Sequence, residues 1–309
     1  MLLAGFDAGQ TTTRCRIVER VGEHWKEIAT GVGPGVSHLE ADNGIKRFQD
    51  ALLTSTAKAG AIGKLDAAVI GASGIEHGTP LQDRASRLMA RTLHVPPEYA
   101  LATGDERTAL RGAFPDQSGI VAISGTGMIC IGRNGQGREH RCGGWGWRLD
   151  GAGAAFDLGH QGLQLSLRMA DGRLPDHPLR KELWTLLGCT SSVDLKALVV
   201  RPEFGPAQFA ALAPAVVAAA KDGLNEAQEI VDRSATAQAD SIQSVAMALG
   251  IHQPRVVGQG GAFDNLQPFR IAVKAALSTA MPDALWCEPQ GDACAGALSL
   301  AKDLAIRPR

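Results

Sequence analysis

The sequence predicts an α/β fold made of two domains that share one order of strands and helices. A pattern of strand, polar turn and strand begins the chain and recurs near residue 119. After each occurrence, segments with helical spacing of apolar residues alternate with apolar strands, as is typical of α/β domains. The length of 309 residues, 45% of them hydrophobic and 20% charged, is sufficient for two domains with ordinary cores.

The first half of the chain predicts three strands followed by alternating helices and strands. An apolar run ends at Asp7, polar turn residues follow, and residues 14–19 then alternate polar and apolar side chains. Thr79-Pro80 is typical of a helix start, because proline is tolerated in the first helical turn. The expected strands are residues 2–6, 14–19, 24–30, 67–71 and 99–103, with helices over 45–53 and from Thr79-Pro80 onward.

The second half repeats this order and then becomes rich in helices. An apolar strand over 119–124 leads through Gly125-Thr126-Gly127 into a strand at 128–132. The remaining expected elements are a strand at 139–142, helices over 153–169, 206–222 and 226–249, a strand at 255–258, and an amphipathic helix over 292–305.

No low-complexity linker separates the two halves. The segment Phe114-Pro115-Asp116 predicts a hinge between packed domains. We therefore expect an N-terminal domain of residues 1–115, which the C-terminal helix 293–309 joins, and a C-terminal domain of residues 116–292.

Charge and cysteine content exclude several classes of function. With 31 basic and 32 acidic residues the formal net charge is −1, so no overall field attracts nucleic acid or an anionic membrane. The six cysteines form no CxxC pair and predict reduced thiols. The residues before Asp7 lack a basic signal-peptide region, and Pro214 interrupts the longest apolar run, so we expect a soluble, cytoplasmic protein without a membrane partner.

Several nucleotide and hydrolase motifs do not fit this sequence. A dinucleotide fingerprint opens a helix, whereas both glycine-containing turns lead into a second strand. No GxxxxGK[ST], HExxH or Cys/His cluster occurs, which argues against a P-loop and a zinc site. Ser73 ends a strand but lacks GxSxG spacing, so a serine hydrolase is not expected.

The two strand-turn-strand units predict a polyphosphate clamp. Backbone N–H groups and hydroxyls of two such turns, facing each other across a cleft, suit the phosphates of a nucleotide, and Asp7 is able to hold its Mg²⁺ directly or through water. The alternative for either turn alone is an ordinary hairpin, because Gly and Asp are common in turns. The recurrence of the unit favours the clamp.

The motifs resemble those of the acetate kinase, sugar kinase, Hsp70 and actin superfamily. Within it, the chain resembles the BadF/BadG/BcrA/BcrD ATPases, in the branch typified by N-acetylglucosamine kinase. Residues 7–14 look like its first phosphate motif, 119–127 like its second, 143–146 like the sugar-site turn, and 256–261 like the adenosine motif. The resemblance implies two ribonuclease H-like βββαβα domains around a cleft, with ATP and Mg²⁺ as cofactors. It also implies phosphate binding by Gly9, Gln10, Thr11, Thr12, Gly125, Thr126 and Gly127, and adenosine binding by Gly260 and Gly261.

Asp105 is the expected general base. The kinases place a catalytic aspartate at a strand end before a short helix, and Gly104-Asp105-Glu106-Arg107 matches that pattern. A carboxylate near the acceptor hydroxyl is the protein group most expected to take its proton during phosphoryl transfer. Because Asp also favours the N-cap, the residues alone leave a capping role open.

The resemblance places the sugar on residues from both halves. Ser37 stands where the family has Asn, His38 is retained, Ser73 precedes a glycine as in the kinases, and Gly144-Trp145 lie in the sugar-site turn. The chain departs from the family's Gly-Asp-Glu-Gly-Ser, since residues 150–154 are Asp-Gly-Ala-Gly-Ala. Asp150 is therefore either a substitute sugar ligand or a helix N-cap.

We expect an ATP-dependent kinase for an amino-sugar hydroxyl, with N-acetylglucosamine or glucosamine as substrate. The alternative is an ATPase activator of a 2-hydroxyacyl-CoA dehydratase or benzoyl-CoA reductase type of system, which needs cluster thiolates from Cys142 and Cys189 at a dimer interface. A sugar-binding regulator is disfavoured, because the first strand leaves no room for an N-terminal DNA-binding segment. The expected partners are ATP and the sugar, with no nucleic acid, and a homodimer remains open.

Overall fold

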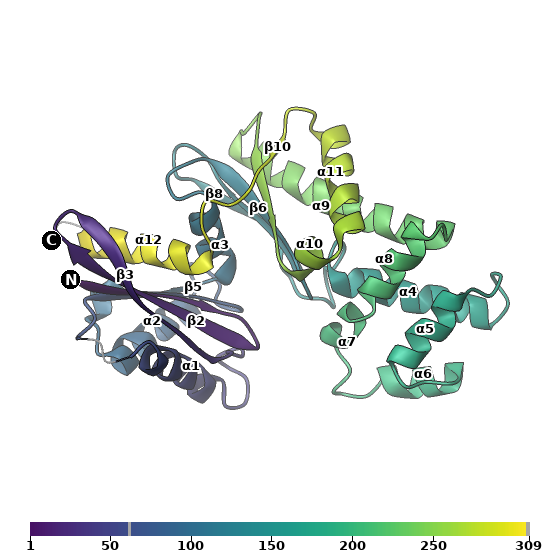
Figure 1. Cartoon of the computed structure of the whole chain (residues 1–309), viewed down its shortest axis with the longest axis horizontal. Helices are drawn as coiled ribbons and strands as arrows, with labels where there is room; N and C mark the ends of the chain where they lie inside the picture. Colours follow the sequence, from purple (N-terminus) through teal and green to yellow (C-terminus); the bar gives the residue numbers. More distant parts are fainter. Residues whose placement is uncertain (61–62, 307–309) are drawn as a thin grey trace. The chain divides into compact units, whose positions relative to one another are not determined.

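The computed structural model describes residues 1–60 and 63–306. The chain divides into two compact units. The N-unit comprises residues 1–117 and 288–309, and the C-unit comprises residues 118–287. Each unit has one five-stranded sheet covered by helices (Figure 1).

The N-unit sheet has the strand order β3-β2-β1-β4-β5. Its first three strands form antiparallel hairpins, whereas β1, β4 and β5 run parallel, so their carboxyl ends share one edge. The strands are β1 (Leu2–Ala8), β2 (Thr12–Val21), β3 (His24–Pro34), β4 (Ala67–Ala72) and β5 (Ala100–Thr103).

Helices cover both faces of this sheet. Helices α1 and α2 lie on one face, and α3 and α12 lie on the other (Figure 1). Apolar side chains of neighbouring residues in β4 therefore enter separate cores: Ile70 packs in the cluster of Phe48, and Val69 packs with Leu298 of α12. The helices are α1 (Gly44–Lys58), α2 (Pro80–Leu93), α3 (Asp105–Ala113) and α12 (Ala293–Ile306), with a 3₁₀ turn at Pro97–Tyr99.

The C-unit sheet repeats this topology with the order β10-β9-β6-β7-β8. Strands β6, β7 and β8 are antiparallel, and β9 and β10 extend the sheet in parallel from β6. The predicted α/β fold of two equivalent domains is therefore confirmed. The strands are β6 (Gly119–Ser124), β7 (Met128–Arg133), β8 (Glu139–Gly143), β9 (Arg255–Gln259) and β10 (Leu285–Trp286).

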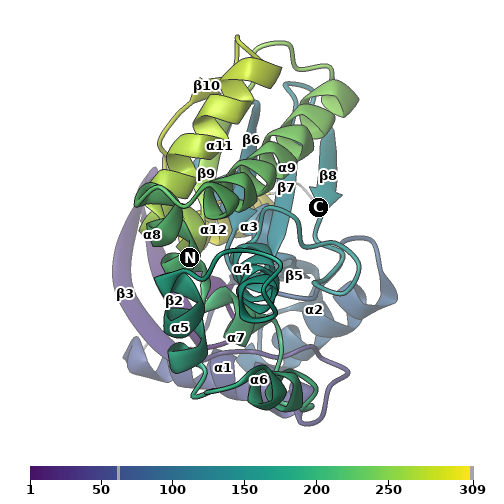
Figure 2. The same cartoon turned by 90° about the vertical axis from the view of Figure 1, so that its right-hand side faces the viewer.

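The helices of the C-unit are more numerous than the sequence predicts. Helices α9 and α11 pack against each other, and α4–α8 form a group next to the sheet (Figures 1 and 2). The helices are α4 (Ala155–Ala170), α5 (Pro178–Leu186), α6 (Ser192–Val199), α7 (Pro206–Ala210), α8 (Ala213–Lys221), α9 (Asn225–Leu249), α10 (Gly261–Asn265) and α11 (Gln267–Ala280).

The single helix predicted over residues 206–222 is wrong, because this segment forms α7 and α8. Pro214 lies in the first turn of α8, where its missing N–H costs least. The last helix ends at Ile306, and residues 307–309 of the predicted helix lie outside the described residues.

All six cysteines are free thiols, as predicted. Among the described residues, no helix is both long and apolar enough to cross a membrane.

Candidate active site

Three predicted site residues of the N-unit lie where parallel strands end. Asp7 is the second-to-last residue of β1 and pairs with Gly71 of β4, and Ser73 follows β4 directly. The Ser73 N–H donates to the Ala8 carbonyl at 3.4 Å. Asp105 follows β5. The carboxyl edge of a parallel sheet is the usual place for ligands in open α/β folds, and here it brings these residues together.

The first predicted phosphate turn, residues 9–12, is held by backbone hydrogen bonds. The Gly9 N–H donates to the Thr12 carbonyl at 3.0 Å, and the Gly35 N–H donates to the Thr11 carbonyl at 3.0 Å. A Cβ on Gly35 would collide with the Gln10 carbonyl, so only glycine permits this contact. The side chains of Gln10, Thr11 and Thr12 remain exposed.

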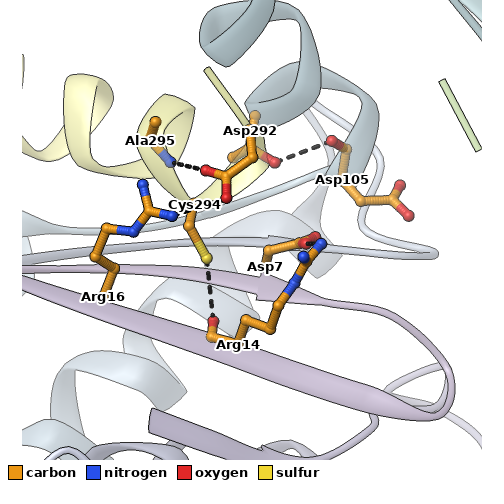
Figure 3. A network of polar contacts seen from close by, with 8 residues as sticks. Asp7, Arg14, Arg16, Asp105, Asp292, Cys294 and Ala295 are labelled. Carbon is orange, nitrogen blue, oxygen red and sulfur yellow. Dashed lines mark hydrogen bonds and ion pairs between the residues drawn. The ribbon is translucent and has the colours of Figure 1, made fainter. Parts of the chain in front are cut away.

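An arginine that the sequence analysis did not assign to the site lies beside Asp7. Asp7 and Arg14 are direct cross-strand partners, and Arg14 Nη2 donates to Asp7 Oδ2 at 2.6 Å (Figure 3). The carboxylate raises the pKa of Arg14 through this hydrogen bond. The sequence contained a signal for Arg14, because the regular register of the predicted hairpin places residues 7 and 14 opposite each other.

Asp105 is the first residue of α3, and Gly104 occupies the N-cap. The Asp105 carboxylate accepts the adjacent Glu106 N–H at 3.1 Å, and Thr108 Oγ1 donates to the Asp105 carbonyl at 2.9 Å. The alternative that Asp105 is the N-cap of this helix is therefore wrong, because Gly104 is the N-cap and Asp105 is the first residue of α3. Burial and the charge of Asp7 raise the pKa of Asp105 above its ordinary value.

The structure brings two separate predicted sugar segments of the N-unit into contact. A Cβ on Gly74, next to Ser73, would lie 3.0 Å from His38 Cδ2, so the imidazole packs on this glycine. His38 Nδ1 accepts the Glu40 N–H at 3.3 Å. The hydroxyl oxygen of Ser37 is buried and has no hydrogen-bond partner among the described residues. An unpartnered buried hydroxyl is costly and suits a polar ligand.

In the C-unit, the second phosphate turn and the predicted adenosine glycines are neighbours. The Gly125 N–H donates to the Gly127 carbonyl at 2.9 Å, which closes the turn. Gly260 has φ 98° and lies so close to Ser124 that a Cβ would be 2.6 Å from its carbonyl oxygen. Residues 124–127 and 260–261 thus form one continuous glycine-rich surface.

A buried network holds the second turn and was not predicted. Ser124 Oγ and Gln238 Nε2 both donate to the Gly153 carbonyl, at 2.7 and 2.9 Å. Asp157 accepts the Gly153 N–H at 3.3 Å and the Ser234 hydroxyl at 2.5 Å. Ser124, Ser234 and Gln238 are fully buried. Helix α9 thereby anchors the altered segment 150–154 to the phosphate turn.

The predicted sugar-site turn of the C-unit presents an exposed aromatic ring. Trp145 is 62% exposed, with the Arg141 guanidinium 4.6 Å from its ring centroid. Gly144 has φ 79°, and a Cβ there would collide with Ile129. Asp150 is not a helix N-cap, because Ala154 precedes α4. Among the described residues its carboxylate has no hydrogen-bond or ion-pair partner.

The residues of the N-unit suit a magnesium ion carried by a nucleotide. Within residues 1–60 and 63–306, no group of three or more His, Cys, Asp or Glu could hold a metal by itself. Mg²⁺ usually needs only one or two carboxylates, since phosphates and water supply its other ligands. Asp7, whose side chain is 17% exposed, meets this requirement.

The two candidate cluster cysteines have separate local partners. Cys142 in β8 is the direct cross-strand partner of Cys130 in β7. Cys189 is buried after α5, and its thiol donates to the Leu187 carbonyl at 3.8 Å.

Two equivalent α/β units with glycine-containing turns after their first strands have the fold of the sugar kinase, Hsp70 and actin superfamily. The chain belongs to the BadF/BadG/BcrA/BcrD ATPase family, whose profile matches residues 4–301.

Individual relatives carry sugar-kinase names. The chain is 28% identical to the N-acetylmuramic acid/N-acetylglucosamine kinase of Clostridium acetobutylicum, over 65% of this chain and 67% of that protein. It is 34% identical to the N-acetyl-D-glucosamine kinase of Dictyostelium discoideum, over 43% of this chain and 42% of that protein. A Chromobacterium violaceum structure provisionally named N-acetylglucosamine kinase superposes with a TM-score of 0.74 and 27% identity, covering 97% of this chain and 98% of that one.

Proposed function

We propose that the protein is an ATP-dependent kinase that phosphorylates a hydroxyl of an amino sugar, N-acetylglucosamine or glucosamine. The observation that carries the proposal is Asp105, a carboxylate with raised pKa at the carboxyl edge of the N-unit sheet. The names of the relatives support the substrate class.

In this proposal Asp105 accepts the proton of the attacking sugar hydroxyl. A general base is most effective when its pKa approaches the working pH, and burial together with the charge of Asp7 shifts Asp105 in that direction. The hydrogen bond from Glu106 N–H orients the carboxylate at the start of α3. Proton removal makes the hydroxyl oxygen a better nucleophile for the terminal phosphorus of ATP.

The two turns supply the phosphate contacts. Backbone N–H groups and hydroxyls for this purpose come from Gly9, Thr11 and Thr12 in the N-unit and from Gly125 to Gly127 in the C-unit. Gly260 and Gly261 are proposed to border the adenosine. Asp7 would hold Mg²⁺, which neutralises charge on the phosphates during transfer.

The sugar is proposed to contact Ser37, His38, Ser73, Gly144, Trp145 and Asp150. Ser37 supplies a buried hydroxyl without a protein partner, and Trp145 supplies an exposed ring. Asp150 supplies the acidic group of the altered segment, because its carboxylate is unpaired among the described residues.

An ADP-release assay tests the proposal. MgATP is combined with N-acetylglucosamine, glucosamine, N-acetylmuramic acid and glucose, the sugar phosphate is identified by mass spectrometry, and iron is measured on the same preparation. We expect ADP and sugar phosphate in equal amounts with an amino sugar. ADP release that no sugar stimulates, together with bound iron, would favour the activator alternative.

A further inference from the structure

The helical group of the C-unit contains an apolar cavity that the proposed kinase site does not use. The cavity has a volume of about 410 Å³ and lies between α4 and α6, with Phe209 of α7 at one end. Its walls are mainly Leu163 and Leu167 of α4 and Val193 and Val199 of α6. Ligand pockets of proteins are commonly of this size and predominantly apolar.

The elements around the cavity are held in place by contacts outside it. A Cβ on Gly159 would collide with the Phe209 carbonyl, so α4 and α7 are in direct backbone contact. The Phe209 ring packs edge-on against Phe156, with centroids 5.4 Å apart. At the start of α6, Ser191 and Asp194 form a capping box. These contacts hold the walls of the cavity in place.

The polar groups at the cavity select the charge of a ligand. Lys196 is exposed, lines the cavity and has no ion pair among the described residues. Burial lowers the pKa of His160, which favours the neutral form of its ring. Within the part of the chain that the structure describes, no aspartate or glutamate lines the cavity, and the nearby Asp194 carboxylate accepts hydrogen bonds from Thr190 and Ser191. Lys196 is the one lysine or arginine among these described lining residues, and the walls are otherwise mainly apolar.

We propose that this cavity binds a free carboxylate with a medium-length apolar chain. The chain lies between the leucines of α4 and the valines of α6, and the carboxylate pairs with the Lys196 ammonium. Val193, which is 73% exposed at the cavity, extends the apolar surface toward solvent and provides the entrance. The proposal does not rest on the kinase function, because none of these residues belongs to the proposed active site.

Calorimetric titration of the full chain with octanoate, without ATP or sugar, tests the site. We expect saturable 1:1 binding. Lys196→Gln should weaken octanoate binding about fivefold, as expected for one partly exposed ion pair, and leave octanol binding unchanged. The matched control Lys181→Gln, on the exposed face of α5, should bind octanoate like the wild type. Val199→Trp, which narrows the cavity, should abolish binding of both ligands while the melting temperature is retained.

Three outcomes would overturn the proposal. Absence of octanoate binding to the wild type is the first. Equal effects of Lys196→Gln and Lys181→Gln would show that the cation does not contribute. A dimer that Val193→Asp dissociates, with no octanoate binding, would show that a second copy of the chain covers this surface.

Discussion

The first hairpin turns of the two units occupy the same place in the fold and differ in chemistry. Asp7 and Arg14 are the second cross-strand pair from the turn of the N-unit hairpin, and Ser124 and Met128 are the pair next to the turn of the C-unit hairpin. The N-unit pair is an ion pair, whereas Ser124 is fully buried and hydrogen-bonded to Gly153. One topology therefore supports a charged turn and a neutral one.

This difference separates two tasks that a phosphoryl-transfer enzyme must perform. In the proposed function, charge stabilisation and proton removal need ionisable groups, and the N-unit contains Asp7, Arg14 and Asp105. Positioning of phosphates needs a turn that is held in place, and the buried network of Gly153, Ser124 and Gln238 is proposed to hold the C-unit turn. We expect substitutions of these ionisable groups in the N-unit to change turnover and pH dependence, and substitutions in the buried network of the C-unit to change nucleotide affinity.

The largest effect is expected from Asp105→Asn. The amide retains the shape of the side chain and removes the proton acceptor, so kcat should fall about a hundredfold to ten-thousandfold, with little change in the KM for ATP. Steady-state kinetics with MgATP and N-acetylglucosamine measure both constants. Asp150→Asn is the matched carboxylate control in the C-unit and should keep most of its kcat. If kcat of Asp105→Asn stays within about threefold of wild type while kcat of Asp150→Asn falls, Asp150 of the C-unit and not Asp105 of the N-unit is the base.

Asp7→Asn should lower kcat/KM about tenfold to a hundredfold and shift its pH dependence. The decrease follows from weaker Mg²⁺ positioning. The negative charge of Asp7 raises the pKa of Asp105, so its removal lowers that pKa and keeps the base deprotonated to lower pH. The acid limb of the kcat/KM profile should therefore move to lower pH.

Asp292→Asn is the control for this shift. Asp292 is a carboxylate of the same region and pairs with Arg16 at 2.8 Å (Figure 3). Its neutralisation should leave the acid limb in place. Equal shifts of the acid limb in both variants would mean that the pKa of Asp105 depends on the total charge of the region and not on the proximity of Asp7.

Gln238→Leu tests the rigidity of the C-unit turn. The substitution removes the hydrogen bond from Nε2 to the Gly153 carbonyl and should raise the KM for ATP about threefold to tenfold, with kcat nearly unchanged. The melting temperature should fall by about 2 to 6 °C. Gln228→Leu, at an exposed position of the same helix, is the control. A decrease in kcat without a change in KM would contradict the assignment of this network to nucleotide positioning.

The smallest effect is expected from Trp145→Ala. Loss of an aromatic contact should raise the KM for the sugar about twofold to tenfold and leave the KM for ATP unchanged. The control is Trp25→Ala in the N-unit, where the Lys302 ammonium lies over the indole ring. This substitution should change neither the KM for the sugar nor the KM for ATP. Equal increases in both KM values for Trp145→Ala would place the ring outside the sugar site.

The sequence predicted the strands better than the helices. Each predicted strand is present, because apolar runs bounded by turn residues are a local signal. Helices α5, α6, α10 and α11 were not predicted, although Ser191 and Asp194 carry the spacing of a capping box at the start of α6. Helices α5, α6 and α10 are short and bury few residues, so their apolar periodicity is weak. Helix α11 is longer and buries Phe269, Val273 and Leu277 at helical spacing, so its sequence carried a signal that the prediction missed.

Part of the candidate site was predicted from the residues alone and part from the family resemblance. Asp7 was identified because an apolar run ends there and turn residues follow. Ser73 and Asp105 were assigned through the resemblance to the sugar kinases, and the parallel strands bring them to one sheet edge with Asp7. The Gln238–Gly153 contact was not predictable, since 85 residues separate the two and Gln238 lies inside the 25-residue helix α9. Such contacts depend on how a helix rotates against its sheet.

Helix α12 makes the N-unit discontinuous in the chain, and this has a consequence for biosynthesis. Its Ala297, Leu298 and Ala301 pack with Leu3 of β1 and Val69 of β4. On the ribosome, β1 and β4 emerge long before residues 118–287 are complete, and their α12-facing side chains stay uncovered until the last helix is translated. The C-unit is continuous in sequence and is able to assemble its core first. The face of the N-unit sheet that α12 covers can therefore be completed only after the whole C-unit has been synthesised.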